Sequence, residues 1–352
     1  MLAELLRAHP GAARSPEQRR AVRAILSCRT ALQGGHLFRC SPCAKLEFAY
    51  HSCQHRACPN CGALQARDWL EQRRLRLLPV PYFLLTFTVP EELRAVFKME
   101  PKFFYDLLFA VTSQALREVA LSKLGGEPGF LGVLHTWSRQ LIFHPHLHYI
   151  VPGGFLSGNR LRWIRLKNPQ YLLPEKVLSR RVRSLFRRAL QARPELPVPA
   201  AAWRKEWIVN TQPVGSGEKA LAYLAAYVQR TALGSQRIVK EEHGRTTFTY
   251  RQSDTGRWKL LTLDTPEFLR RFLQHVLPAG FHRVRYYGWW CPAAKAKWAR
   301  ILALLDWKEP ARPPKRPAWV KPCPGCGQPM QLLGRLPRGP PGSTPRQDIQ
   351  TR

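Results

Sequence analysis

Three histidines lie close together in residues 143–154, which read FHPHLHYIVPGG. Side chains alternate between the two faces of a β-strand, so His146 and His148 would point the same way, roughly 7 Å apart along the strand. Two imidazoles on one face of a sheet can hold a divalent metal with open coordination positions, as is needed to polarise a scissile phosphate. We therefore predict a catalytic Mg²⁺ or Mn²⁺ at this pair, with His144 in a supporting position. The sequence does not decide which residue is the third metal ligand, and two upstream side chains, His135 and Gln140, are candidates.

Two tyrosines four residues apart, Tyr223 and Tyr227, are the candidate nucleophiles. The segment 216–230 has the pattern of a helix whose apolar stripe consists of Leu221, Leu224, Ala225 and Val228. Both tyrosines fall on a second face, more than a quarter-turn from that stripe, which indicates that they are presented rather than packed. A tyrosine pair alone is typical of ordinary packing, but beside a histidine strand it predicts covalent catalysis. Two arginines follow at positions suited to phosphate binding, Arg230 and Arg237.

Nine cysteines in one chain, clustered in sequence, indicate metal binding rather than disulfides in a reducing compartment. Two CxxC turns, Cys40/Cys43 and Cys58/Cys61, are about 15 residues apart, the usual arrangement for one tetrahedral zinc. A site saturated with cysteine has no open position for water, so this zinc should be structural. The basic residues around it, Arg56 among them, suggest that the module contacts DNA.

The other cysteines leave several interpretations open. Cys53 could replace one of the four zinc ligands, remain a buried thiol, or join a second site with Cys28, His36, His51 or His55. The C-terminal pair Cys323/Cys326 is half of a zinc-binding motif, because no second CxxC follows it. It could recruit Cys291, bind zinc weakly or have no role.

The elements that position these residues follow from hydrophobic periodicity. Strands are expected at 82–89 and 141–151, and amphipathic helices at 101–121 and 180–190. Eleven prolines between Pro310 and Pro345, interleaved with Lys and Arg, predict an extended and largely disordered tail with a lone CxxC. We expect a zinc-binding, DNA-contacting domain at 1–75, a catalytic domain at 76–290 and a basic Pro-rich tail at 291–352.

The charge balance points to a polyanionic partner. Fifty-six Lys and Arg against 23 Asp and Glu give a formal charge of +33, so nucleic acid is favoured and an anionic membrane surface comes second. The longest apolar run, at 77–90, is shorter than the roughly 20 residues of a spanning helix. With no signal peptide at the N-terminus, we expect a cytoplasmic, nucleoid-associated bacterial or archaeal protein.

In their order, these motifs resemble the two-tyrosine rolling-circle transposases of the IS91 type. The similarity runs from the cysteine turns through LHTW, HPHLHYIVPGG, the YLxxYV helix and RWKLLTL to FLRRFLQHVLPAGFHRVRYYG. It implies an α+β fold of the HUH endonuclease type, a central antiparallel sheet with flanking helices preceded by a small zinc-binding domain. His146 and His148 would bind the divalent metal, and Tyr223 and Tyr227 would attack single-stranded DNA at transposon ends to give a 5′-phosphotyrosine.

The same resemblance implies that no nucleotide cofactor is needed, because the covalent link conserves the energy of the broken bond. If only one tyrosine acts, Tyr227 is favoured. Two rival interpretations remain. A replication initiator or relaxase of the HUH class would share the chemistry, whereas a non-enzymatic zinc-dependent DNA-binding protein would bind DNA with steep salt dependence and form no covalent adduct.

Overall fold

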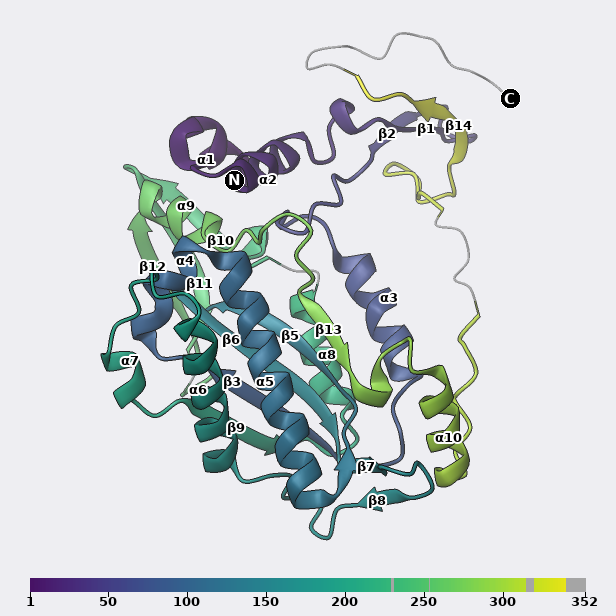
Figure 1. Ribbon diagram of the computed structural model, residues 1–352. Helices are drawn as coiled ribbons and strands as arrows, with labels where there is room; N and C mark the ends of the chain where they lie inside the picture. The colour runs from purple at the N-terminus through teal and green to yellow at the C-terminus, as the bar shows by residue number, and fades with distance from the viewer. Residues whose placement is uncertain (229–230, 253, 315–319, 340–352) are drawn as a thin grey trace.

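A five-stranded sheet, in the order β13-β5-β6-β3-β9, forms the centre of the computed structural model (Figure 1). All neighbouring strands in it are antiparallel. The strands are β3 (Tyr82–Thr88), β5 (Phe130–Trp137), β6 (Phe143–Pro152), β9 (Ile208–Pro213) and β13 (Val284–Tyr287). The histidine strand β6 is thus the middle strand. The structure describes residues 1–228, 231–252, 254–314 and 320–339.

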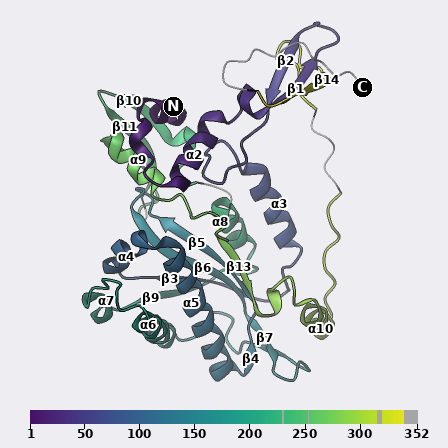
Figure 2. The ribbon, with the colours of Figure 1, turned by 45° about the horizontal axis from the view of Figure 1, so that its top comes forward.

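Helices cover both faces of this sheet (Figures 1 and 2). On one face, Leu147, Tyr149 and Val151 of β6 belong to the main apolar core with side chains of α5 (Pro101–Leu124) and α6 (Glu175–Gln191). On the other face, Ile150 packs with the helix α8 (Glu218–Val228) and with residues of α3 (Ala63–Arg74). The alternation predicted for the histidine strand is therefore confirmed, and it leaves His146 and His148 on the α8 side.

A second layer lies at the end of the sheet where the histidines are. The strands β10 (Ile238–Glu242), β11 (Arg245–Arg251) and β12 (Trp258–Asp264) form a separate antiparallel sheet. This sheet shares an apolar cluster with three helices, α1 (Leu2–Ala8), α2 (Pro16–Ser27) and α9 (Thr265–Leu273). Smaller elements are α4 (Arg94–Met99), α7 (Ala201–Arg204), α10 (Lys295–Leu305), β4 (Gly126–Glu127), β7 (Gly154–Ser157) and β8 (Trp163–Arg165).

The two ends of the chain meet in a third sheet. The strands β1 (Gly35–Arg39) and β2 (Leu46–Tyr50) form a hairpin, and β14 (Gln331–Leu336) pairs antiparallel with β1 (Figure 2). The chain beyond Glu309 was predicted to be extended and largely disordered, and this is wrong for β14. The edge of β1 that does not pair with β2 forms hydrogen bonds with β14, and these bonds order the segment. Two parts of the tail, 315–319 and 340–352, lie outside the described residues.

The other predicted elements are present with shifted ends. The strand expected at 82–89 is β3, the helix expected at 101–121 is α5, and the basic helix expected at 180–190 begins earlier, at Glu175. The α+β class with a central antiparallel sheet is confirmed. Within the described residues no helix combines the length and apolarity required to cross a membrane.

Candidate active site and metal centres

Three histidines from two strands meet on the α8 face of the sheet. His135 of β5 lies opposite His146 of β6 in the antiparallel register, and His148 follows two residues further along β6. Residues directly opposed in an antiparallel pair point to the same face, as do residues i and i+2 of one strand. The candidate ligand atoms of the three rings all lie within 4.8 Å of one another. His135 thus stands where a third ligand is needed, whereas Gln140 is not part of the group.

Hydrogen bonds orient the two rings of β6. The Nδ1 of His146 lies 2.7 Å from the carbonyl oxygen of His144, and because that oxygen only accepts, Nδ1 carries the proton. The Nδ1 of His148 lies 2.9 Å from the Thr86 hydroxyl on β3. A bond at Nδ1 leaves Nε2 of each ring free to bind a metal.

Burial keeps these imidazoles neutral. It lowers the pKa of His146 to about 4 and that of His148 to about 3, and it lowers the pKa of His135 well below its usual value. The Nε2 of His135 is buried without a hydrogen-bond partner among the described residues, which is costly unless another ligand uses its lone pair. Three neutral nitrogen donors, one of them unpartnered, fit a divalent metal ion.

The two tyrosines of α8 lie over this group. The ring centroid of Tyr227 is 4.1 Å from that of His135, and that of Tyr223 is 6.0 Å from that of His148. Gly217, which precedes α8, has φ +78°, and a Cβ there would lie 2.6 Å from the Tyr82 ring. Only glycine therefore allows the helix to begin so close to the sheet.

The two tyrosines differ in exposure. Tyr223 is 43% exposed, as expected for a presented side chain, whereas Tyr227 is half-buried and packs against the apolar cluster of the second layer. The predicted stripe, Leu221, Leu224, Ala225 and Val228, is buried. Burial, followed by the neighbouring Tyr227, raises the pKa of Tyr223.

A buried arginine connects the tyrosine helix α8 to the strand β5. The Nη1 of Arg283 donates a 2.7 Å hydrogen bond to the carbonyl oxygen of Tyr227. Its guanidinium lies 5.5 Å from the centre of the Trp137 ring, and that ring stacks on His135 at 5.7 Å. Sequence reasoning did not select Arg283, although it lies within the FHRVRYYG segment.

A cleft of about 880 Å³ opens above the histidines and tyrosines. His135, His146, Tyr223 and Tyr227 line it, and the turn Cys58–Cys61 forms part of its wall. The cleft also receives three basic side chains, those of Arg29, Arg139 and Arg237. A polyanion that enters it would meet both candidate nucleophiles beside the histidines.

The structure separates the three arginines predicted to bind DNA. Arg237 lines the cleft and is held by two hydrogen bonds to the Thr249 carbonyl oxygen, at 2.9 and 2.6 Å. Arg56 instead donates to three backbone carbonyl oxygens, those of Leu277, Pro278 and Phe281, and does not line the cleft. Arg230 lies outside the described residues.

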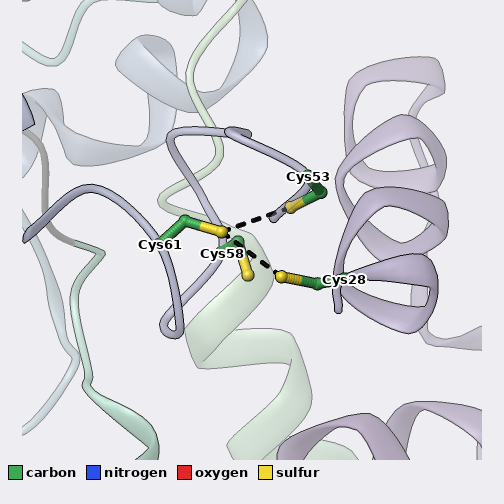
Figure 3. A group of neighbouring side chains, drawn as sticks. All are labelled: Cys28, Cys53, Cys58 and Cys61. Carbon is green, nitrogen blue, oxygen red and sulfur yellow. Dashed lines mark hydrogen bonds between the residues drawn. The ribbon is translucent and has the colours of Figure 1, made fainter. Parts of the chain in front are cut away.

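The cysteines form two separate groups of four. Cys28, Cys53, Cys58 and Cys61 lie together, with Sγ–Sγ distances from Cys61 of 3.3 Å to Cys28 and 3.6 Å to Cys53 (Figure 3). Cys40 and Cys43 lie with Cys323 and Cys326 instead. A tetrahedral zinc with Zn–S bonds of about 2.3 Å needs sulfurs separated by roughly 3.8 Å, close to these values.

The expectation that one zinc joins the two N-terminal CxxC turns is therefore wrong. The hairpin β1–β2 carries Cys40 and Cys43 away from Cys58 and Cys61, which lie against the end of α2, where Cys28 follows Ser27. Of the partners considered for Cys53, Cys28 is the one present, and His36, His51 and His55 are not in the group. The expectation that the C-terminal pair has no partner CxxC is wrong, because Cys323 and Cys326 lie with Cys40 and Cys43. Cys291 belongs to neither group.

Comparison with known proteins identifies the family. Residues 129–297 match the family described as "Putative transposase", and residues 3–89 match the "Transposase zinc-binding domain" of IS91 elements. The chain is 42% identical over 297 residues to "Putative transposase y4qJ" of Sinorhizobium fredii (strain NBRC 101917 / NGR234), covering 78% of this chain and 74% of that protein.

It is also 28% identical over 291 residues to "Transposase for insertion sequence element IS801" of Pseudomonas savastanoi pv. phaseolicola, covering 75% of this chain and 68% of that protein. No solved structure matches. A transposase acts on DNA, and the zinc-binding region agrees with the cysteine groups. The chain belongs to the family of IS91-type transposases.

Proposed function

We propose that this transposase cuts and rejoins single-stranded DNA at the ends of an insertion sequence through a tyrosine nucleophile, and moves the element by a rolling-circle-like route. The observation that carries the proposal is the position of Tyr223 and Tyr227 directly over three neutral histidines, two of which, His135 and His146, line the same cleft as the tyrosines. A nucleophile and a metal-binding group must both lie within reach of one phosphate for such chemistry.

The histidines would hold Mg²⁺ or Mn²⁺ through His135, His146 and His148. When bound, the ion supplies Lewis-acid polarisation of the scissile phosphate. Nδ1 of His146 donates to the His144 carbonyl oxygen and Nδ1 of His148 to the Thr86 hydroxyl. These bonds fix the two β6 rings, so the metal-binding Nε2 atoms are in place before the ion and the DNA arrive.

The tyrosine supplies the covalent step. The Oη–P bond forms while the bond from phosphorus to the 3′ oxygen breaks; the phenol loses its proton and the departing oxygen gains one. The products are a 5′-phosphotyrosine and a free 3′-hydroxyl, and attack by a 3′-hydroxyl on the phosphotyrosine reseals the strand. Two nucleophiles on one helix would allow a second cleavage before resealing.

Tyr223 is the better placed of the two to meet an incoming strand, because it is the more exposed. Tyr227 lies nearer to His135 and is anchored through its carbonyl oxygen by Arg283. The three cleft arginines, Arg29, Arg139 and Arg237, would bind the flanking phosphates. The four-cysteine group beside the cleft would hold a structural zinc.

Covalent capture tests the proposal. The full chain is incubated with labelled single-stranded DNA from the flanks of its own gene and Mn²⁺, and a denaturing gel separates protein-linked DNA. The expected adduct requires metal, disappears in Tyr223→Phe/Tyr227→Phe and falls strongly in His146→Ala, while the single variants rank the tyrosines. Tyr171→Phe is the matched control, since that tyrosine is exposed and does not line the cleft.

Two results of the covalent-capture experiment would contradict the proposal. Tight, salt-dependent binding without any adduct, on every flanking strand and with zinc present, would favour the non-enzymatic DNA-binding alternative. An adduct that persists in the double variant would place the nucleophile elsewhere.

A further inference from the structure

A second set of four cysteines joins the two ends of the chain. Cys40 and Cys43 follow β1, and Cys323 and Cys326 precede β14, yet all four sulfurs lie within 4.8 Å of one another. The Sγ atoms of Cys40 and Cys326 are 3.5 Å apart across a sequence separation of 286 residues. Neither family match includes the C-terminal pair, because the matches cover residues 3–89 and 129–297.

The two CxxC turns have the same local geometry. The amide of Cys40 donates to the Lys45 carbonyl oxygen and that of Cys323 to the Gln328 carbonyl oxygen, each at 2.9 Å and each five residues along. The residue after the second cysteine has positive φ in both turns, +51° at Ala44 and +74° at Gly327. Two turns of the same shape that face each other are the usual way to aim four thiolates at one ion.

The C-terminal turn also directs a donor at its sulfur. The amide of Gly325 lies 3.4 Å from Sγ of Cys323. An N–H group aimed at sulfur stabilises the thiolate, which is the form that binds metal.

The apolar core of this module is too small to explain the packing. Its buried members are Phe38, Met330 and the two cysteines Cys40 and Cys323, with Ala49 against them. Modules with so little buried apolar surface usually depend on a metal or a disulfide. Cys43 and Cys326 are exposed, so hydrophobic burial does not account for them.

Zinc explains the arrangement better than a disulfide. The 3.5 Å separation of Cys40 and Cys326 is far from the roughly 2.05 Å of an S–S bond, and it is near the spacing of two sulfurs on one tetrahedral zinc. All four thiols also converge on one point, whereas a disulfide would need only a pair.

We propose that Cys40, Cys43, Cys323 and Cys326 bind a second structural Zn²⁺, which holds the C-terminal segment on the N-terminal hairpin. The module of β1, β2 and β14 is then a zinc ribbon assembled from both ends of the chain. The nearby group of Cys28, Cys53, Cys58 and Cys61 is a separate site. This inference does not depend on the nicking mechanism.

Zinc content of the full chain tests the proposal. The protein carries His146→Ala so that zinc at the histidines is not counted, and it is purified under reducing conditions and analysed by elemental mass spectrometry. Two zinc ions per chain are expected. Cys323→Ser/Cys326→Ser should halve the content, and Cys58→Ser/Cys61→Ser should halve it independently. Cys291→Ser is the matched control and should keep both ions, because Cys291 is in neither group.

Cobalt substitution keeps the test decisive if a variant folds poorly. The His146→Ala chain should bind two equivalents of Co²⁺ with the absorption of tetrahedral thiolate sites, and the C-terminal double variant in the same background should show half of that absorption. One zinc per His146→Ala chain, or zinc unchanged when Cys323→Ser/Cys326→Ser is added to it, would overturn the proposal. A Cys40–Cys326 disulfide found by mass spectrometry of the non-reduced chain would do so as well. A missing DNA adduct would bear only on the nicking mechanism.

Discussion

The hydrogen bond that His148 Nδ1–H donates to the Thr86 hydroxyl should set the affinity for the catalytic metal. His148 is only 8% exposed, and its Nδ1 lies 2.9 Å from the Thr86 hydroxyl. Thr86→Val keeps the volume and branching of the side chain but removes this partner. The tautomer that binds metal through Nε2 then holds a buried, unpaired Nδ1–H, which costs about 1–3 kcal/mol.

That cost corresponds to a loss of metal affinity of about 10–100-fold, which is the usual effect of removing a partner of a ligating histidine. The assay is adduct formation on single-stranded DNA as a function of Mn²⁺ concentration. The half-saturating concentration should rise by about 10–100-fold, while the adduct level at saturating Mn²⁺ stays near that of the wild type.

Thr88→Val is the matched control. Thr88 lies opposite His146 on the same face of the sheet, but its hydroxyl forms no hydrogen bond within the part of the chain that the structure describes. The control should leave the Mn²⁺ dependence unchanged. An equal shift in both variants, or a shift below about threefold in Thr86→Val, would refute a specific role for this bond.

Three further predictions follow from the site and its surroundings. Half-maximal adduct formation should need less Mn²⁺ than Mg²⁺, because three imidazole nitrogens suit a transition metal and Mg²⁺ prefers oxygen ligands; equal requirements in a metal titration would argue against the three-histidine set. Burial lowers the pKa of His275 from 6.5 to about 3. Below pH 6.5 His275 is therefore protonated in the unfolded chain but still neutral in the folded chain, and the free energy of unfolding falls as the pH drops. Denaturant unfolding should show a loss of about 2 kcal/mol between pH 6.5 and 5 from this residue, and His275→Gln should flatten that part of the profile. Arg237→Gln should reduce the salt dependence of DNA binding by about one phosphate contact, whereas Arg56→Gln should leave it unchanged and lower stability by about 2 kcal/mol, because three carbonyl oxygens lose a charged donor.

Short-range patterns in the sequence predicted the parts of the site that lie on single elements. The alternation that puts His146 and His148 on one face depends only on the geometry of one strand. The buried stripe of α8 follows in the same way from helical periodicity, and the structure agrees with both.

The third histidine required knowledge of strand pairing. His135 joins the group because β5 and β6 pair with His135 opposite His146, and that register contains an irregularity between His135 and Trp137. A shift by one residue would turn His135 to the other face. Local sequence contains no direct measure of this register, so His135 could only be a candidate.

The cysteine grouping was beyond local reasoning for a related reason. Each CxxC predicts a turn that presents two sulfurs, but which turns share an ion depends on where the chain carries them. Proximity in sequence favoured joining Cys40/Cys43 to Cys58/Cys61, whereas the fold pairs the first turn with Cys323/Cys326. Arg56 shows the same limit of local sequence patterns. Its charge suggested DNA binding, but the three carbonyl oxygens that it contacts belong to residues more than 200 positions away in the sequence.

The four-cysteine group next to the cleft would connect a structural zinc to the proposed reaction. Its turn Cys58–Cys61 forms part of the cleft wall, and α3 begins directly after it, at Ala63. That helix then packs along the tyrosine helix, where Arg74 forms a 3.2 Å ion pair with Glu218. An exposed ion pair contributes little by itself, so the position of α3 depends mainly on its packing and on the turn at its start. A zinc held by this group would therefore fix the cleft wall and the helix that supports Tyr223 and Tyr227.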